Sequence, residues 1–517
     1  MKLNKKLALA VASAVLSISS SAFAAVDFLN DDAPFKTDLN IAGHNGDLQF
    51  YGIIDIGYMS VNHSLPINRS LPNNYYPYSY DAATGSSASS PINVGRQSNF
   101  INGGMQDSRF GLKGGIDLFG AADTKFKLIY QLEAGFNPLN GSLNDATKAL
   151  QQNSKVDCAT PKTCTVFADS SLNGELFARQ AWIGIDGGYL GKVTYGTQYN
   201  PFYDIAGQYD PNQKSDSFSP LGQSGSVGGG GGISENARMK NSIKYANSFP
   251  VKELMDGKIN VSAMYQYGND VDTEWGRGYA AQAGYENSLF GFQAAYSNFT
   301  DTVKVDLEKT NAIGATNPTG IKAGLYDTEG VMLAAKLTPT KWAKLSGGWE
   351  WMQLSQPTDN NINYGSVFGY AIENGIASTA NNSGKGIGKD NGGDHQNVYF
   401  WWLGGEYNFA EHVPALSGLT LSAAYYRTKY DDISGTDPYY SSDTAGTGFG
   451  YNINTETTVL DYKINKRFDV YAAATWNQFG GDFVNGKSTK KNAGASQGGD
   501  MLYKDINAFG VGVRMKF

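Results

Sequence analysis

Only a few short stretches of this chain have the residue types and spacing that catalysis requires. Residues 494–498 have the G-x-S-x-G spacing of a serine nucleophile, but they lack the strand–turn–helix context that exposes such a serine. Residues 385–389 lack the spacing of a phosphate-binding loop. Residues 270–274 are acidic without forming an EF-hand, and the four histidines are scattered. We therefore expect neither an enzyme nor a metal or cofactor site.

The two cysteines, Cys158 and Cys164, lie within a polar stretch. In an oxidising compartment a pair at this spacing closes a small disulfide loop. A zinc site would need further cysteine or histidine ligands at set spacing, and none is near in the sequence. The sequence therefore predicts a disulfide.

Basic residues recur on one face of stretches that alternate with a period of two. Arg109 and Lys113 share a face opposite large apolar residues, and Arg238, Lys240 and Lys244 share a face of a later stretch. A period of two is that of a β-strand. Whether each face lies in water or in an apolar medium depends on how the strands that carry these side chains are arranged.

The same strand-like period extends over most of the chain. At the C-terminus Phe509, Val511, Val513, Met515 and Phe517 lie on one face, whereas glycine, arginine and lysine lie on the other. One face of such a strand lies in an apolar medium. Alternation alone does not distinguish a soluble sandwich from a membrane barrel.

The lengths of the connections make this distinction. Short turns alternate with long polar connections, which is typical of transmembrane barrels with strands of about 9–11 residues. Because backbone groups cannot stay unpaired in lipid, such strands must close into a ring. Aromatic residues near the strand ends suit interfacial girdles, among them Tyr51, Tyr58, Tyr199, Tyr203, Tyr425 and Tyr426. The predicted strands are 48–62, 106–117, 125–137, 176–187, 192–199, 238–247, 257–268, 276–286, 290–299, 328–338, 342–354, 395–408, 418–430, 453–464, 468–479 and 505–517.

Composition excludes several other classes of protein. Charged residues make up 17% of the 517 residues and the net charge is −7, so the chain lacks the excess of basic residues that nucleic-acid binders carry. Apolar residues are plentiful, which argues against a disordered chain. After the first two dozen residues no apolar run is long enough for a spanning helix. The sequence favours one large all-β barrel.

The first 24 residues have the features of a secretory signal peptide. Lys2, Lys5 and Lys6 precede a short apolar stretch, and small residues end at Ala22-Phe23-Ala24. The apolar stretch is too short to span a membrane. We expect cleavage after Ala24, which takes the net charge from −7 to −10 because three lysines are lost. Residues 25–517 then form a single barrel domain.

Several stretches resemble the general-diffusion porins of Gram-negative bacteria, especially the β-proteobacterial branch. The resemblance extends over the whole mature chain and includes the terminal Phe517, which is similar to the family's assembly signal. The stretches are LQFYGIIDIG (48–57), DSRFGLKG (107–114), YQLEAGF (130–136), LFARQAWIG (176–184), YGTQYNPFYD (195–204), KNSIKY (240–245) and DYKINKR (461–467).

This resemblance implies a homotrimer of antiparallel barrels of about sixteen strands, with short periplasmic turns, long extracellular loops and a third loop folded into the lumen. It also implies a pore constriction in which a basic wall faces an acidic loop. The basic residues are Arg109, Lys113, Arg179 and Lys240, and the acidic residues are Asp204, Asp210, Asp216 and Glu235. Such opposed charges filter solutes by charge and polarity. Thr197 replaces an arginine that the family usually has, and the role of residues 228–232 is open.

The resemblance implies a porin of the Gram-negative outer membrane through which small hydrophilic solutes and ions diffuse passively. Lipid and lipopolysaccharide would surround it, and no nucleic acid is expected as a partner. A substrate-selective porin and a surface-binding barrel, such as an adhesin or receptor, are the alternatives. Only a porin would give large, ohmic, stepwise conductance in a bilayer.

Overall fold

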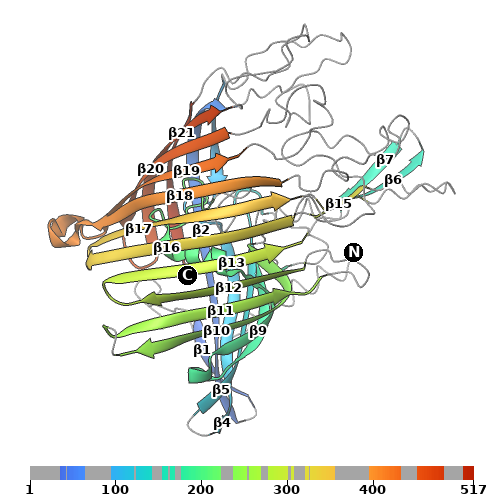
Figure 1. The fold of residues 1–517 in the computed structure, drawn as a ribbon, viewed down its shortest axis with the longest axis vertical. Helices are drawn as coiled ribbons and strands as arrows, with labels where there is room; N and C mark the ends of the chain where they lie inside the picture. Colours follow the sequence, from blue (N-terminus) through green and yellow to red (C-terminus); the bar gives the residue numbers. More distant parts are fainter. Residues whose placement is uncertain are drawn as a thin grey trace.

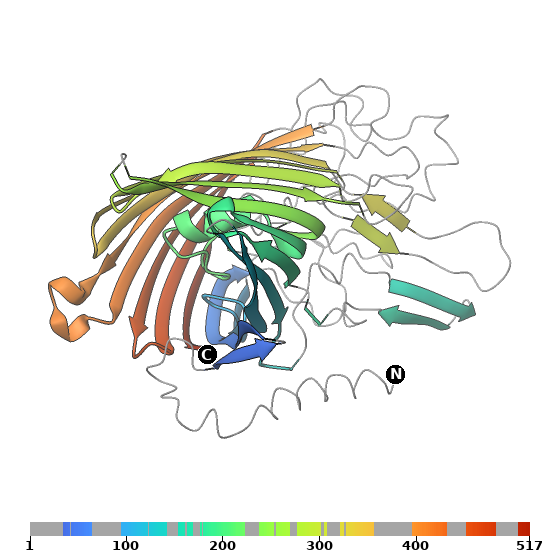
Figure 2. The same ribbon diagram turned by 90° about the horizontal axis from the view of Figure 1, so that it is seen from below.

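The computed structural model shows a curved antiparallel sheet that closes on itself (Figures 1 and 2). The signal peptide expected over residues 1–24 lies outside the described residues, and so does Glu235. The structure describes residues 35–41, 43–64, 95–121, 124–141, 154–160, 163–168, 176–177, 179–222, 237–252, 255–268, 277–300, 304–307, 321–324, 327–355, 395–431, 451–481 and 505–517.

The sheet is a closed barrel of 16 strands, as the sequence predicts. Each strand pairs antiparallel with the next, and the last strand pairs with the first. The strands are β2 (His44–Ser64), β4 (Arg109–Ala121), β5 (Thr124–Gly135), β8 (Gln180–Asp186), β9 (Lys192–Tyr199), β10 (Arg238–Val251), β11 (Gly257–Gln266), β12 (Gly278–Glu286), β13 (Phe290–Phe299), β16 (Asp327–Thr340), β17 (Ala343–Ser355), β18 (His395–Asn408), β19 (Leu419–Tyr430), β20 (Tyr451–Lys463), β21 (Phe468–Gly481) and β22 (Asp505–Lys516).

Two short strands extend the pairing along β2. On one edge, β1 (Lys36–Ile41) pairs with the start of β2 and β22 pairs with its later half. On the other edge, β4 pairs with the start of β2 and β3 (Gly95–Asn102) pairs with its end. The strand predicted over 106–117 therefore begins only at Arg109. Residues 103–108 form a bend between β3 and β4, which we call the inner bend.

Connections at one end of the barrel are short and those at the other end are long. Residues 341–342 join β16 to β17, whereas residues 356–394 separate β17 from β18. Two hairpins belong to the long connections: β6 (Ser154–Thr160) with β7 (Thr163–Ala168), and β14 (Lys304–Leu307) with β15 (Ile321–Gly324). Cys158 and Cys164 are cross-strand partners in the first hairpin, and their disulfide stays a prediction.

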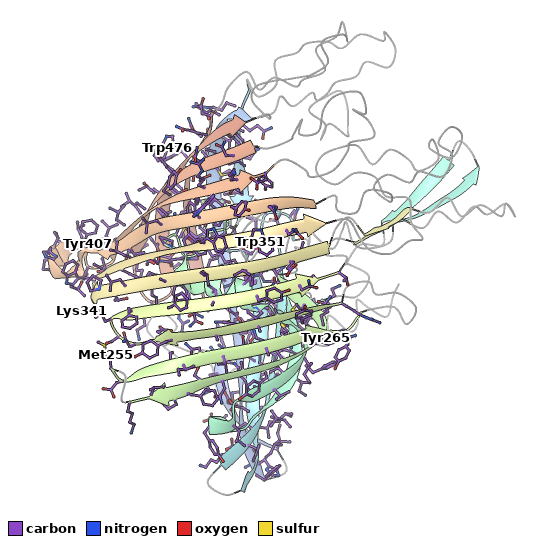
Figure 3. All side chains as sticks on the ribbon, viewed as in Figure 1. Met255, Tyr265, Lys341, Trp351, Tyr407 and Trp476 are labelled. Carbon is purple, nitrogen blue, oxygen red and sulfur yellow. The ribbon has the colours of Figure 1, made fainter. Side chains whose placement is uncertain are left out.

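The barrel exposes apolar side chains outward and buries polar side chains inward. Leu403 is 67% exposed on the outer face of β18, whereas Glu133 and Arg514 are 3% and 2% exposed on the inner face. Tyr265, Trp351 and Trp476 lie near the long-loop end of the wall, and Tyr407 lies near the short-turn end (Figure 3). An apolar outer band between aromatic residues is typical of a barrel in a lipid bilayer. Among the described residues, no helix has the length and hydropathy needed to span a membrane.

Candidate functional site

A helix occupies the interior of the barrel. The connection from β9 to β10 begins with α4 (Pro201–Tyr209), which starts where the side chain of Asn200 accepts a hydrogen bond from the backbone N–H of Tyr203 at 2.8 Å. Proline at the first helical position suits this start because its missing N–H would have no partner in the helix. We call residues 200–222 the lumen segment. Figure 2 shows α4 inside the curve of the wall.

The lumen segment packs against the far side of the inner wall through an apolar core. Phe202, Ile205 and Tyr209 are fully buried. The Trp402 indole N–H donates to the Tyr209 carbonyl at 3.1 Å. The wall contributes to the core from four strands, with Ala295 of β13, Met332 and Ala334 of β16, Phe400 and Trp402 of β18, and Ala424 and Tyr426 of β19. Apolar side chains on an inner face are thus buried by the chain itself.

Asp210 fixes the lumen segment beyond the helix. Its carboxylate accepts hydrogen bonds from the hydroxyls of Tyr426 at 2.5 Å and Ser219 at 2.6 Å, and from the backbone N–H of Lys214 at 2.8 Å. The residue is 1% exposed, and burial raises the pKa of its carboxyl group. The expectation that Asp210 faces passing solutes is therefore wrong, because its carboxylate is enclosed by the loop and the wall.

On the opposite wall, Arg179 is the centre of an ionic cluster. Its guanidinium contacts the carboxylates of Asp107 at 2.8 Å and Glu133 at 2.9 Å, and it donates to the Tyr199 hydroxyl at 3.1 Å. Tyr51 donates to the same glutamate at 2.9 Å. Arg179 lies immediately before β8 and is 5% exposed. Its charge is neutralised within the wall because both carboxylates contact it there.

Arg109 and Lys113 extend this cluster along β4. The Arg109 guanidinium lies 3.6 Å from the Glu133 carboxylate, and 20% of the arginine side chain is exposed. The Lys113 ammonium lies 5.0 Å from the centroid of the Tyr51 ring. Parity thus placed both residues on the inner face, together with Glu133. These side chains form the part of the basic wall that the structure brings together.

Lys240 lies where strand parity fails. A bulge interrupts β10 between Met239 and Ser242, and Asn241 has a φ of 47°. Because the bulge adds one residue, strand parity does not extend across it, and the shared face of Arg238, Lys240 and Lys244 stays a prediction. Beyond the bulge, Lys244 contacts the Asp204 carboxylate at 2.7 Å.

Asp216 and Lys214 connect the lumen segment to the Arg179 cluster. Tyr203 stacks on Tyr199 at 3.8 Å between ring centroids, and the Lys214 ammonium lies over the Tyr203 ring. Burial lowers the pKa of Lys214 to about 7. Burial, and next the charge of Asp107, raises the pKa of Asp216 well above its usual value. The centre of the site thus favours neutral forms of both groups.

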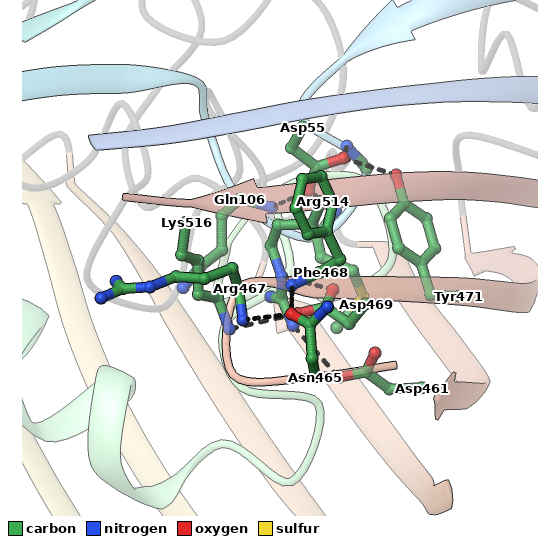
Figure 4. Close-up of polar contacts among 12 residues, drawn as sticks. Asp55, Gln106, Asp461, Asn465, Arg467, Phe468, Asp469, Tyr471, Arg514 and Lys516 are labelled. Carbon is green, nitrogen blue, oxygen red and sulfur yellow. Dashed lines mark hydrogen bonds and ion pairs between the residues drawn. The ribbon is translucent and has the colours of Figure 1, made fainter. Parts of the chain in front are cut away.

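A second ionic cluster lies on the inner face of the closing strands (Figure 4). Arg514 contacts the carboxylates of Asp469 at 2.8 Å and Asp461 at 3.1 Å, and Lys516 contacts Asp469 at 3.3 Å. None of these residues was predicted as a site residue, although Arg514 and Lys516 lie on the polar face of the terminal strand. Within the described residues, no group of His, Cys, Asp and Glu could hold a metal ion.

Several residues of the site were not predicted as site residues. Glu133 shares the polar face of its strand with Gln131, so parity could have identified it. Asp107 lies in the inner bend, where no period applies. Tyr51, Tyr199 and Tyr426 were assigned to the aromatic girdles, but their hydroxyls bond inside the barrel. Strand-end position alone does not tell which face an aromatic residue takes.

Comparison with known proteins yields one family and several solved structures. A family model described as Gram-negative porin matches residues 8–413. The anion-selective porin from Comamonas acidovorans has a TM-score of 0.50 and 13% identity, covering 91% of this chain and all of that chain. OmpT, an outer membrane protein of Vibrio cholerae, has a TM-score of 0.48 and 14% identity; the match covers 95% of this chain and all of OmpT. The Salmonella typhi OmpF complex with daunomycin has a TM-score of 0.44 and 15% identity; the match covers 93% of this chain and all of that chain. No curated protein sequence matches significantly.

Proposed function

The chain belongs to the Gram-negative porin family, and on this premise we propose how its channel is built. The protein is an outer-membrane channel for passive diffusion of small hydrophilic solutes and ions. The observation that carries the proposal is the lumen segment, which lies inside the barrel and divides the inner wall into a covered apolar side and an ionic side. Solutes pass between that segment and the ionic side. No step of diffusion requires catalysis.

We propose that the constriction consists of Arg109, Lys113 and Arg179 on one side and of Asp204 and Asp216 on the other. The first three residues belong to the ionic cluster, and the two acids belong to the lumen segment. Lys240 and Glu235 remain candidates from the family resemblance. Asp210 acts by holding the lumen segment in place.

Charge pairing within the constriction supports weak ion selectivity. Arg179 is neutralised by Asp107 and Glu133, and Asp204 by Lys244. Arg109 and Lys113 are the more accessible cations, so the narrow part favours anions. The acidic mature chain favours cations over longer distances, but surface charges act only within about 8–10 Å at physiological salt. We propose a weak anion preference at high salt that declines as salt falls.

Planar-bilayer recording tests this function. The purified barrel should give large, ohmic, stepwise conductance, and its reversal potential in a salt gradient should indicate weak anion preference. A correctly folded barrel that gives no conductance steps would contradict the proposal, and it would favour a surface-binding role for the long loops.

We propose that the barrels assemble as homotrimers surrounded by lipid and lipopolysaccharide, after export and removal of residues 1–24. Family membership and the apolar outer wall support this assembly. Electrophoresis without heating should show a species of three subunits that heating converts to monomers. A monomer under both conditions would oppose it.

Phe517 is proposed to promote assembly of the barrel. Its ring lies 5.5 Å from that of Phe50 and 6.3 Å from that of Phe35, and its backbone N–H donates to the Gly52 carbonyl at 3.0 Å. These contacts close the last strand onto the first. Deletion of Phe517 should lower the amount of folded, heat-modifiable protein in the outer membrane. An unchanged folded yield would contradict this role.

A further inference from the structure

Asp55 of β2 makes an unusual set of contacts with the inner bend. The residue is fully buried on the inner face. Its carboxylate accepts hydrogen bonds from the backbone N–H groups of Gly104, Met105 and Gln106 at 3.4, 2.9 and 2.8 Å, and from the Tyr471 hydroxyl at 2.7 Å. Figure 4 shows Asp55 between the bend and β21. One carboxylate thus satisfies three successive backbone donors.

The backbone of Asp55 also bonds to the inner bend. The Gly103 N–H donates to the Asp55 carbonyl at 3.0 Å, and the Asp55 N–H donates to the Ser108 hydroxyl at 3.0 Å. On this edge β2 pairs with β4 up to Ile53 and with β3 from Ile56. The bonds of Asp55 replace the strand pairing in the gap between these two stretches. Asp55 therefore supplies contacts at both ends of the bend.

The inner bend in turn contacts both sides of the constriction. The backbone N–H groups of Asp216 and Ser217 donate to the carbonyls of Met105 at 3.3 Å and Gly104 at 3.1 Å. At the end of the bend, Asp107 pairs with Arg179. The same six residues thus contact the lumen segment and the ionic cluster.

We propose that Asp55 is a positioning residue of the channel, which holds the inner bend so that the lumen segment and Arg179 keep their separation. This inference rests on the proposed constriction. Because hydrogen bonds to a charged acceptor are stronger than neutral ones, a single buried carboxylate can order three consecutive residues of irregular backbone. Asp55 sets the geometry of the narrow part without contacting a solute.

Tyr471 makes the arrangement specific. Its hydroxyl lies so close to Gly104 and Gly512 that a Cβ at either glycine would collide with it. Glycine is therefore required at both positions for β21, β22 and the bend to approach one another. The tyrosine donates to Asp55 from β21, which is separated from β2 by β22, so the carboxylate is bonded both to the bend and to the closing strands.

The test compares Asp55→Asn with Asp461→Asn. Asparagine keeps the shape of aspartate, but its amide nitrogen cannot accept from the backbone donors. Asp461 is also a buried carboxylate on the inner wall, 4% exposed, and it contacts Arg514. Hydrogen exchange by mass spectrometry would follow residues 103–108 and 215–219, with bilayer recording on the same samples. We expect Asp55→Asn to accelerate exchange in both segments by about tenfold or more, and to shift the reversal potential. Asp461→Asn should leave exchange in both segments at the parental rate.

Unchanged exchange and an unchanged reversal potential in Asp55→Asn would overturn the proposal. Exchange that accelerates in β11–β13 as much as in residues 103–108 and 215–219 would also overturn it, because it would indicate general destabilisation. If Asp55→Asn does not fold, Tyr471→Phe removes one donor to the carboxylate and receives the same two measurements, with the same interpretation. If the parent forms no channel, the proposed function fails, while exchange still tests whether Asp55 positions the bend.

Discussion

The two sides of the inner wall differ in chemistry although they belong to one barrel. On β4 and β5 the inner face carries Arg109, Lys113 and Glu133, whereas on β16 and β18 it carries Met332, Phe400 and Trp402. The lumen segment covers the second side and excludes water from it, so apolar side chains are stable there. The ionic side keeps its charges by pairing them. The path of the lumen segment therefore decides which inward side chains can contact solutes.

Replacing Phe202 by Ala should break the apolar side and have the largest effect. The side chain is fully buried between α4 and the wall, and a Phe→Ala change in a packed core costs about 3–5 kcal/mol. We expect weaker docking of α4, seen as larger and more variable single-channel conductance with an intact barrel. Leu403→Ala on the outer face is the control. Equal conductance traces for parent and Phe202→Ala would show that docking does not define the channel.

Replacing Arg109 and Arg179 together by Gln should break the ionic side. Asp107 and Glu133 would lose their partners, so the reversal potential should move toward cation preference while conductance persists. Loss of one partner of a buried ion pair costs about 3–5 kcal/mol, so folded yield is measured in parallel. Lys429→Gln is the control, because Lys429 lies at the surface of β19. A constant reversal potential would exclude these arginines from the constriction.

The pH dependence should sharpen the comparison, because Asp216 lies where the lumen segment meets the ionic side. Its folded pKa is raised by burial, so its stabilising contribution is complete below the unfolded pKa and is lost as pH rises through the folded pKa. Intrinsic-rate-corrected exchange of residues 215–219 should therefore increase with pH. Asp216→Asn should flatten that dependence. The same slope in both proteins would assign the effect to another group.

Lys214 contributes with the opposite sign at higher pH. Its folded pKa of about 7 is below the unfolded value of 10.5, so the unfolded chain binds more protons and stability rises with pH between these two values. The Asp216→Asn comparison isolates the carboxyl group because Lys214 is present in both proteins.

Replacing Cys158 and Cys164 by Ser should have the smallest effect on either side. The predicted disulfide lies in the β6–β7 hairpin, and a loop of this size contributes about 2–3 kcal/mol, mostly locally. Conductance and selectivity should stay at parental values, while limited proteolysis should cut the hairpin faster. Mass mapping that finds two free thiols in the exported parent would refute the disulfide.

Sequence alone determined the strands and the closed barrel. The stretches 192–199, 290–299 and 395–408 coincide with β9, β13 and β18, because a period of two and the alternation of short and long connections are properties of neighbouring residues. The same parity correctly placed Arg109 and Lys113 on the inner face. The sequence did not predict β3, whose polar residues do not alternate, and strand parity does not extend across the bulge beside Lys240.

Only the tertiary structure decided which inward residues share a site. Asp55 meets the inner bend and Tyr471, and Asp107 meets Arg179, because barrel closure brings together segments that are far apart in the sequence. Asp210 was expected to face solutes, yet the path of the lumen segment encloses it. Periodicity shows which face of a strand a side chain takes, whereas the contacts of that face depend on how the chain folds over it.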